Sequence, residues 1–291
     1  MRLKFQIMRL GKDEELKENT KFFTPNYEEL IDEKDTIKDL GVLVDSNLRY
    51  KSQIMSAVSK ARRKLGWVLR TFRTRSVYLL RRLWNSVIQP HLDYGSKVWV
   101  GQATKEQKLL LEGPLRTLTK SAWGCERMNY WERMHKFILN SNERRMEHYA
   151  VIYIWKSLNG KVPSLNLEWT EAQASRSGKN LKLLVLKGPE GRNKTTMRNS
   201  IQYKGMKIFN SVPNEIKTYR GSLESFKTLL DQYLELLLDQ PEIGDLKPEA
   251  LTLTRKPSNS IIDWGRKFEN SISYRTMHLY DNSSGLSVIS H

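Results

Sequence analysis

The sequence predicts a mainly α-helical protein with a small N-terminal β portion, an α+β fold in which helices dominate. Three observations lead to this prediction. Short apolar runs bounded by turn residues stand out within residues 1–50. From residue 51 onward, apolar residues recur at the spacing of one helix face. Residues 241–291 are polar and contain scattered Pro, Ser, Asn and Thr, which indicates a mostly disordered tail.

The sequence divides into four regions: residues 1–50, 51–100, 101–240 and 241–291. Two or three short strands are expected in the first. In "LKFQIMRL", residues 3–10, Phe5 and Ile7 alternate onto one face. Residues 12–38 are acidic and polar and favour loops. A further strand is predicted at residues 42–44, closed by the turn residues "DSN". So few short strands do not make a stable sheet alone, so this region needs the helices that follow.

Residues 51–100 predict two basic helices. The first carries an apolar stripe at spacings of three and four, formed by Ile54, Val58, Ala61, Leu65, Val68 and Phe72. The second is expected over residues 76–88, and Pro90 is expected to end it because proline lacks a backbone donor. The segment "SKVWVG" that follows is compatible with a helix or a strand.

Residues 101–240 predict a further helical region. Thr104 and Gln107 have the spacing of a capping box, and "EGPL" at 112–115 is expected to break or kink the helix that they begin. A central helix is introduced by "NSNE" and ends at Asn159-Gly160. Residues 161–200 read as an irregular, exposed basic loop. Another amphipathic helix follows the cap residue Ser222, and a short helix is expected near "SIIDWGRKF" in the tail.

The positive charge is concentrated in one window of the chain. The formal net charge is +17, and residues 46–92 contain eleven basic residues and no acidic one. Such a footprint favours a polyanionic partner, most often nucleic acid. The alternative is a solvated helix face that only keeps the protein soluble. The window's basic residues are Arg49, Lys51, Lys60, Arg62, Arg63, Lys64, Arg70, Arg73, Arg75, Arg81 and Arg82.

Common catalytic and metal-binding motifs do not occur in the sequence. It contains no phosphate-binding "GxxxxGK", no "HExxH" and no Asp-Asp pair. The five histidines are far apart, and the single cysteine, Cys125, cannot form an internal disulfide, which is typical of a reducing compartment. We therefore expect no cofactor, no metal site and no catalytic residue in this chain. No apolar run approaches the roughly 18 residues that span a bilayer.

Several segments resemble one family in their order along the chain. The most specific are "KDLGVLVDSNLRY" (38–50) and "LWNSVIQPHLDYGSKVW" (83–99). The others are "FQIMRLGK" (5–12), "KARRKLGWVLRTFRTRS" (60–76), "ERRMEHYAVIYIWKSLNG" (143–160), "FNSVPNEI" (209–216), "SLESFKTLLDQYL" (222–234) and "KPSNSIIDW" (256–264). Together they resemble the C-terminal part of the reverse transcriptase of non-LTR (LINE-type, jockey-like) retrotransposons, over about residues 3–265.

The resemblance implies a specific domain assignment. Residues 1–50 would be the end of the palm and primer-grip strands, residues 51–100 a thumb that holds the template–primer duplex, and residues 101–240 the helical region after the thumb. The family's palm holds its catalytic aspartates in a "YADD"-like turn upstream of the segment that resembles "FQIMRLGK". We therefore expect this chain to lack polymerase activity, although the intact parent enzyme, an RNA-directed DNA polymerase, needs Mg²⁺. The "EGP" segment departs from the family pattern, which has a charged helical run there.

The sequence thus predicts a truncated reverse-transcriptase-like protein that binds RNA or an RNA–DNA duplex independently of sequence. We expect an intracellular location, and the basic character and the family resemblance favour the nucleus. The expected binding residues are Lys60, Arg62, Arg63, Lys64, Arg70, Arg73, Arg75, Arg81, Arg82 and Trp67. Three alternatives stay open. The basic helix could be a protein-interaction module that binds calmodulin or another acidic surface, the chain could be a non-functional remnant, or it could be a fragment of a longer catalytic product.

Overall fold

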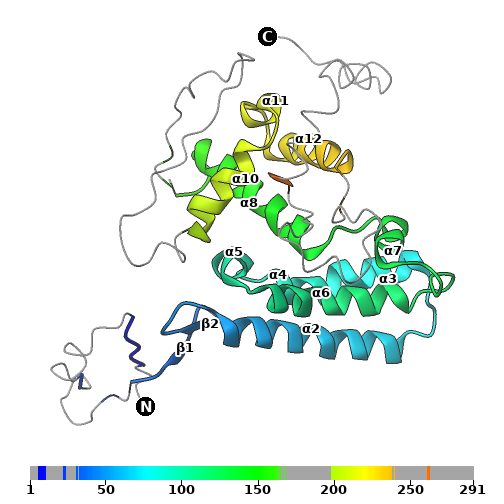
Figure 1. Ribbon diagram of the computed structural model, residues 1–291, viewed down its shortest axis with the longest axis horizontal. Helices are drawn as coiled ribbons and strands as arrows, with labels where there is room; N and C mark the ends of the chain where they lie inside the picture. The colour runs from blue at the N-terminus through cyan, green and yellow to red at the C-terminus, as the bar shows by residue number, and fades with distance from the viewer. Residues whose placement is uncertain are drawn as a thin grey trace, which may run out of the picture. The chain divides into compact units, whose positions relative to one another are not determined.

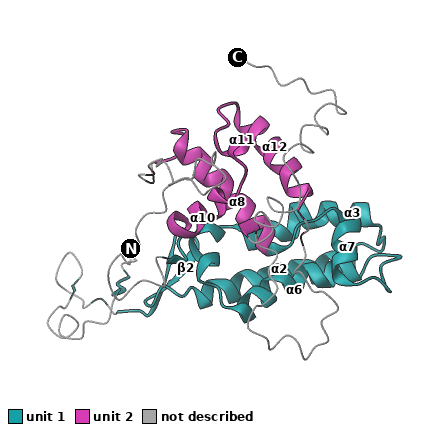
Figure 2. Ribbon diagram, turned by 45° about the horizontal axis from the view of Figure 1, so that its top comes forward, with its two compact units in different colours: residues 1–142, 189–200 teal, residues 143–188, 201–291 magenta. Residues whose placement is uncertain are grey.

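The computed structural model describes residues 6–10, 22–23, 31, 33–163, 165, 167, 198–237, 239 and 261–262. The chain divides into two compact units (Figures 1 and 2). Unit 1 comprises residues 1–142 and 189–200, and unit 2 comprises residues 143–188 and 201–291. The predicted fold class is confirmed, because helices dominate both units and one small antiparallel sheet lies near the N-terminus.

The sheet of unit 1 is a hairpin of β1 (Thr36–Asp39) and β2 (Val42–Asp45), with Thr36 paired to Asp45 and Asp39 to Val42. The prediction of β2 is confirmed, but β1 lies in the stretch expected to be loop. Its two-residue turn has positive φ at Leu40 (43°) and at Gly41 (84°), the geometry of a type I′ turn. The sequence has "LG" there instead of the usual "NG", so the local pattern does not predict this turn.

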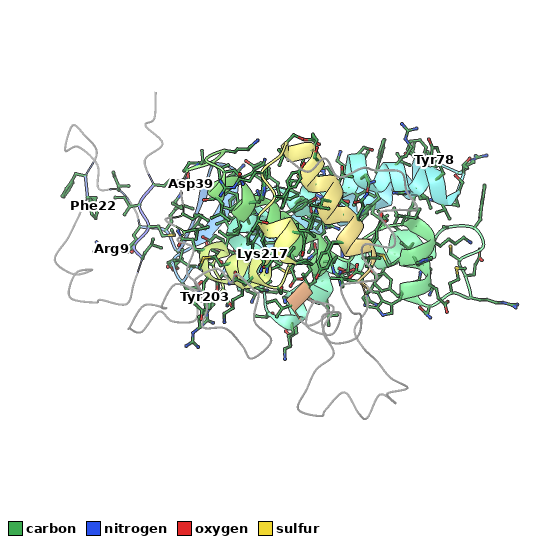
Figure 3. All side chains as sticks on the ribbon, turned by 90° about the horizontal axis from the view of Figure 1, so that it is seen from above. Arg9, Phe22, Asp39, Tyr78, Tyr203 and Lys217 are labelled. Atoms are coloured by element: carbon green, nitrogen blue, oxygen red, sulfur yellow. The ribbon has the colours of Figure 1, made fainter. Side chains whose placement is uncertain are left out.

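The first predicted strand is wrong for the residues that can be judged. Of residues 3–10, only 6–10 are described, and Ile7 forms a single parallel bridge with Glu33. Arg9 pairs with Glu33 at 2.9 Å, and its guanidinium lies over the ring of Phe22, as the labelled side chains show (Figure 3). Polar and cation–π contacts therefore take the place of strand pairing in this segment.

The long basic helix is confirmed as α2 (Lys51–Thr71). Its buried residues include Ile54, Val58, Ala61, Leu65 and Val68, as the apolar stripe predicted. The backbone N–H of Leu43 donates to the side-chain oxygen of Gln53 at 3.0 Å, which fixes the start of the helix to the hairpin. Phe72 is extended and half-buried against the core.

The second basic helix is longer than predicted because Pro90 does not end it. The chain runs through α3 (Val77–Leu83), a π-helical turn, η1 (Trp84–Ile88), and α4 (Gln89–Asp93). Pro90 lies at the start of α4, where a helix tolerates proline because the missing donor has no intrahelical partner to lose. The wider turn before it, in which the N–H of Gln89 bonds to the carbonyl of Trp84, absorbs the change. "SKVWVG" is helical, as α5 (Ser96–Trp99) and η2 (Val100–Gln102).

The helix predicted from Thr104 is α6 (Lys105–Lys120), and both hydrogen bonds of its capping box are present. The expectation that "EGPL" breaks it is wrong, since α6 continues through Pro114. Tertiary contacts override the local preference there. Pro114 and Leu115 are buried, and the buried carboxylate of Glu112 accepts bonds from the Tyr130 hydroxyl and from the N–H of Asn142. Tyr130 belongs to α7 (Tyr130–Phe137), a helix that begins with a capping box of Asn129 and Glu132.

The core of unit 1 lies between α2, the α3–α4 segment, α6 and α7. Its fully buried side chains include Trp84, Trp99 and Phe137. In Figure 1, α2 and α6 run side by side in the same direction. This packing covers one side of α2 and leaves its opposite side on the surface of the unit.

Unit 2 is built on α8 (Asn142–Leu158), followed by η3 (Ile201–Gly205), α10 (Met206–Asn210), α11 (Asn214–Lys217) and α12 (Leu223–Glu235). The predicted end of α8 is confirmed, with Gly160 at φ 65° and a bond from Lys161 N–H to the Lys156 carbonyl at 2.8 Å. Trp155 of α8 stacks on Phe226 of α12 at 4.4 Å between ring centroids and donates to the Tyr219 carbonyl at 2.8 Å. The cap of α12 by Ser222 is confirmed at 3.1 Å from Ser225 N–H.

Some predictions fall outside the described residues. These are most of the basic loop at 161–200 and nearly all of the tail at 241–291, of which only residues 261–262 are described, in a helical conformation. Within the described part of the chain, no helix combines the length and apolarity needed to cross a membrane. The same part contains no cluster of three or more His, Cys, Asp or Glu side chains arranged to hold a metal ion.

Candidate nucleic-acid interface

The surface side of α2 follows from its sequence. With about 3.6 residues per turn, Ile54, Val58, Ala61, Leu65 and Val68 share one face and are buried. The basic residues between them fall on the rest of the helix. Five of these are exposed in the structure: Lys60, Arg62, Arg63, Lys64 and Arg70. We call these five residues the α2 basic face.

One side of the α2 basic face borders a groove of about 650 Å³. The described residues that line it are Met55, Val58, Ser59, Arg62, Arg63, Gly66 and Arg70. All of them belong to α2 and run from Met55 to Arg70, so the groove follows the helix axis. Gly66 leaves its middle without a side chain. Arg62 and Arg70 lie two helical turns apart, about 12 Å by the rise per residue, with Arg63 between them.

Helix α6 borders the Arg62 side of α2. A Cβ added to Gly113 would lie 3.5 Å from a guanidinium nitrogen of Arg62. Arg116 and Lys120 lie on the same face of α6 as Gly113 by helical spacing, and both are exposed. Sequence reasoning missed these two residues because they lie outside the acid-free window. Their spacing of four residues, which places both side chains on one helix face, was the signal in the sequence that could have identified them.

The other side of α2 faces α4. Lys60 and Lys64 lie on that flank, and with Arg63 they lower the pKa of His91 of α4, although burial of the imidazole is the larger cause. Trp67 is 45% exposed, and its ring lies 6.0 Å from Lys64 Nζ. Burial is thus the main reason for the lowered pKa of His91, and the positive charges of Lys64, Lys60 and Arg63 add to it.

The remaining predicted residues lie on the α2–α3 connection and on α3. Arg73 is exposed. Arg82 is exposed and donates to the Tyr78 hydroxyl at 2.9 Å, whereas Arg81 is half-buried. Arg75 is also half-buried, and its guanidinium donates to the carbonyl of Leu69. Arg75 is one of the ten predicted residues, and this hydrogen bond gives it a structural role: it holds the turn between α2 and α3.

No described carboxylate pairs with the α2 basic face. The carboxylates of Glu33, Asp239 and Glu224 lie beside Arg9, Arg144 and Lys227, outside these five side chains. Exposed cations with no acidic partner repel one another and attract polyanions. Geometry and charge together make this face a candidate surface for closely spaced negative charges.

Comparisons with known proteins give limited further information. No protein-family model and no solved structure matches the chain. The chain is similar to an uncharacterized protein of Caenorhabditis elegans, with 27% identity over 124 residues. The matched part is 42% of this chain, and the chain spans 60% of that relative's length. The candidate interface consequently rests on the sequence and the structure.

Proposed function

We propose that this chain binds the phosphate backbone of RNA or of an RNA–DNA duplex without reading its sequence, through the α2 basic face. One observation carries the proposal: five exposed cations lie within three turns of one helix, beside an open groove, without an acidic partner in the described residues. Arginine suits this task because its planar fork matches phosphate oxygens. Contacts of this kind position a duplex and do not distinguish sequences.

The groove adds a reason for a phosphate backbone as the ligand. Arg62 and Arg70 lie two turns apart along α2 with Arg63 between them, and Gly66 lets a strand approach the helix backbone between Arg62 and Arg70. Arg116 and Lys120 extend the positive surface onto α6. A single small anion would need only one of these side chains, whereas a linear polyanion engages several at once.

A charge-matched comparison tests the proposal. Arg62→Gln, Arg63→Gln and Arg70→Gln are combined in one variant of the full chain. A control variant carries Lys38→Gln, Lys207→Gln and Arg220→Gln, which removes the same charge from exposed positions outside α2. We expect the first variant to lose at least tenfold in affinity for a mixed-sequence RNA–DNA duplex at 100 mM salt, and the control to lose less than threefold. Equal losses would mean that only net charge matters and would contradict the proposal.

The identity that best accounts for such a surface is the thumb of a non-LTR retrotransposon reverse transcriptase, as the resemblance implies. Its two most specific segments, residues 38–50 and 83–99, support this proposal because they contact one another: a Cβ on Gly95 would lie 2.9 Å from the Val42 side chain. The test is the coding sequence that precedes residue 1. An in-frame "YADD"-type segment there would make this chain part of an RNA-directed DNA polymerase, and its absence would leave binding as the proposed activity.

The protein-interaction alternative is less well supported. A calmodulin-type partner binds the apolar face of a basic amphipathic helix. In unit 1 that face is the buried one, with Ile54, Ala61 and Val68 fully inaccessible. Binding of this kind would require α2 to leave the core.

A further inference from the structure

Three exposed aromatic side chains belong to the segments next to the α2–α3 connection. Trp67 is 45% exposed, Tyr78 is 68% exposed, and Trp123 of the α6–α7 loop is 59% exposed. We call these three residues the aromatic rim. Figure 3 shows Tyr78 on the outer side of α3. Large aromatic side chains usually contribute to a core. Their exposure next to a basic surface therefore indicates a binding site.

Hydrogen bonds hold the segments of the aromatic rim together. The backbone N–H of Trp123 donates to the carbonyl of Arg75 at 3.0 Å, which ties the α6–α7 loop to the α2–α3 connection. Lys136 Nζ donates to the carbonyl of Gly124 at 3.0 Å and holds the same loop to α7. The Arg75 guanidinium binds back to the carbonyl of Leu69. Two segments that are about 50 residues apart are therefore fixed beside one another.

Cations accompany two of the three rings. Lys64 Nζ lies 6.0 Å from the centroid of Trp67, and the guanidinium of Arg82 lies 5.5 Å from that of Tyr78. Trp67 also meets Phe72 edge-to-face at 6.0 Å and 88°, which leaves the ring supported from one side. Glu126 is the acidic residue of the α6–α7 loop. Its carboxylate accepts a hydrogen bond from the N–H of Gly124 in the same loop at 3.1 Å.

Exposed aromatic faces among Lys and Arg side chains are the usual binding surface for unpaired bases. Each base has a face that can stack on a ring, so such surfaces accept many sequences, whereas the bases of a duplex already stack on one another. The positive surroundings favour a nucleic acid over an apolar protein partner. We propose that the aromatic rim stacks unpaired bases of a strand whose phosphates contact the α2 basic face, so that this protein prefers single-stranded ends to blunt duplexes. This inference rests on the proposed function and deepens it.

The test compares two ligands with the full-length chain. One is a labelled blunt RNA–DNA duplex, and the other is the same duplex with a ten-nucleotide unpaired RNA overhang. In the variant Trp67→Leu, Tyr78→Leu, Trp123→Leu, we expect at least a tenfold loss of affinity for the overhang ligand, since stacking contributes about 1–3 kcal/mol per base. Affinity for the blunt duplex should fall clearly less, because its bases already stack on one another.

Two controls make the outcome decisive. Phe22→Leu combined with Phe23→Leu removes two other exposed rings, 45% and 46% exposed, and should leave both affinities unchanged. Trp67→Tyr with Trp123→Phe keeps stacking faces and should restore most of the overhang preference. Equal affinity of the wild type for both ligands, or equal losses on both in the leucine variant, would overturn the inference and leave the proposed function standing. Failure of the wild type to bind the blunt duplex would overturn the proposed function itself.

Discussion

The hydroxyl of Tyr94 donates a hydrogen bond to the backbone carbonyl of Leu40 at 2.7 Å, across 54 residues of sequence. The bond joins the end of α4 to the tip of the β1–β2 hairpin. Beside it, Trp99 donates from its indole nitrogen to the carbonyl of Tyr94 at 3.1 Å. The hairpin is too small to be stable alone, so these bonds position it against the start of α2.

Replacing Tyr94 by Phe should loosen the hairpin without unfolding unit 1. The Tyr94 side chain is 57% exposed, so the lost bond should reduce the free energy of unfolding by no more than about 1 kcal/mol. Amide hydrogen exchange should speed up in residues 36–45 and stay unchanged in α6. Tyr78→Phe is the matched control, because the Tyr78 hydroxyl accepts only from Arg82 on the same helix surface. Uniform faster exchange across unit 1 would contradict this local role.

Leu40→Asn should stabilise the protein. Leu40 has a φ of 43°, a conformation that leucine adopts at a cost of about 1 kcal/mol, and Asn-Gly is the favoured pair for this turn. Leu40 is 86% exposed, so little apolar burial is lost. We expect thermal denaturation to shift upward by about 2–4 °C. The exposed Leu109 in α6 is the control, since Leu109→Asn should lower the melting temperature because Asn is a poorer helix former.

Glu112→Leu should be the most destabilising of these substitutions. The buried Glu112 carboxylate accepts from the Tyr130 hydroxyl and from the N–H of Asn142 at 2.9 Å. Leucine would remove both of these buried hydrogen bonds, at a cost of about 2–4 kcal/mol. Chemical denaturation measures the loss. Combining it with Tyr130→Phe should recover part of it, because one of the two donors is then removed, and a fully additive loss would argue against this pairing.

His91 should make stability depend on pH. Burial and the nearby Lys64, Lys60 and Arg63 lower its pKa in the folded state below the ordinary value of 6.5. Between the lowered pKa and 6.5, the unfolded chain binds more protons, so the free energy of unfolding falls as the pH falls through this window. His91→Gln should flatten this part of the profile. Parallel profiles for wild type and His91→Gln would contradict the assignment.

Nucleic-acid binding should raise the pKa of His91 again. Phosphates that neutralise Lys60, Lys64 and Arg63 favour the imidazolium and raise its pKa, so binding should take up protons and tighten as the pH falls from 7.5 to 6. Calorimetry in buffers of different ionisation enthalpy measures the uptake directly. Proton release, or the same uptake in His91→Gln, would exclude His91 from the interface.

The sequence was most informative where a local pattern decides the structure. The stripe from Ile54 to Val68 and the cap at Thr104 both predicted what the structure contains. It failed where distant contacts decide. Pro114 is buried inside α6, where packing outweighs its local preference, whereas the exposed Pro90 is tolerated at the start of α4 after a π-helical turn.

The candidate site shows the same division. The exposed cations of α2 were predicted from an acid-free run of charge, which is a property of the sequence itself. The approach of His91 to α2, and the bond between Trp123 and Arg75, depend on how helices pack. No spacing in the sequence encodes either contact. The same packing leaves Arg75 half-buried, with its guanidinium bonded to the Leu69 carbonyl in the α2–α3 turn.

The salt dependence of binding to a blunt RNA–DNA duplex tests the central claim most directly. If the five cations of the α2 basic face each neutralise one phosphate, the logarithm of the association constant should fall with the logarithm of salt concentration at a slope of about −4 to −5. The Arg62, Arg63 and Arg70 triple Gln variant should reduce the magnitude of that slope by about 3, because three counterion-releasing contacts are removed. A slope near zero in the wild type, or an unchanged slope in the triple variant, would contradict the proposal that α2 binds a phosphate backbone.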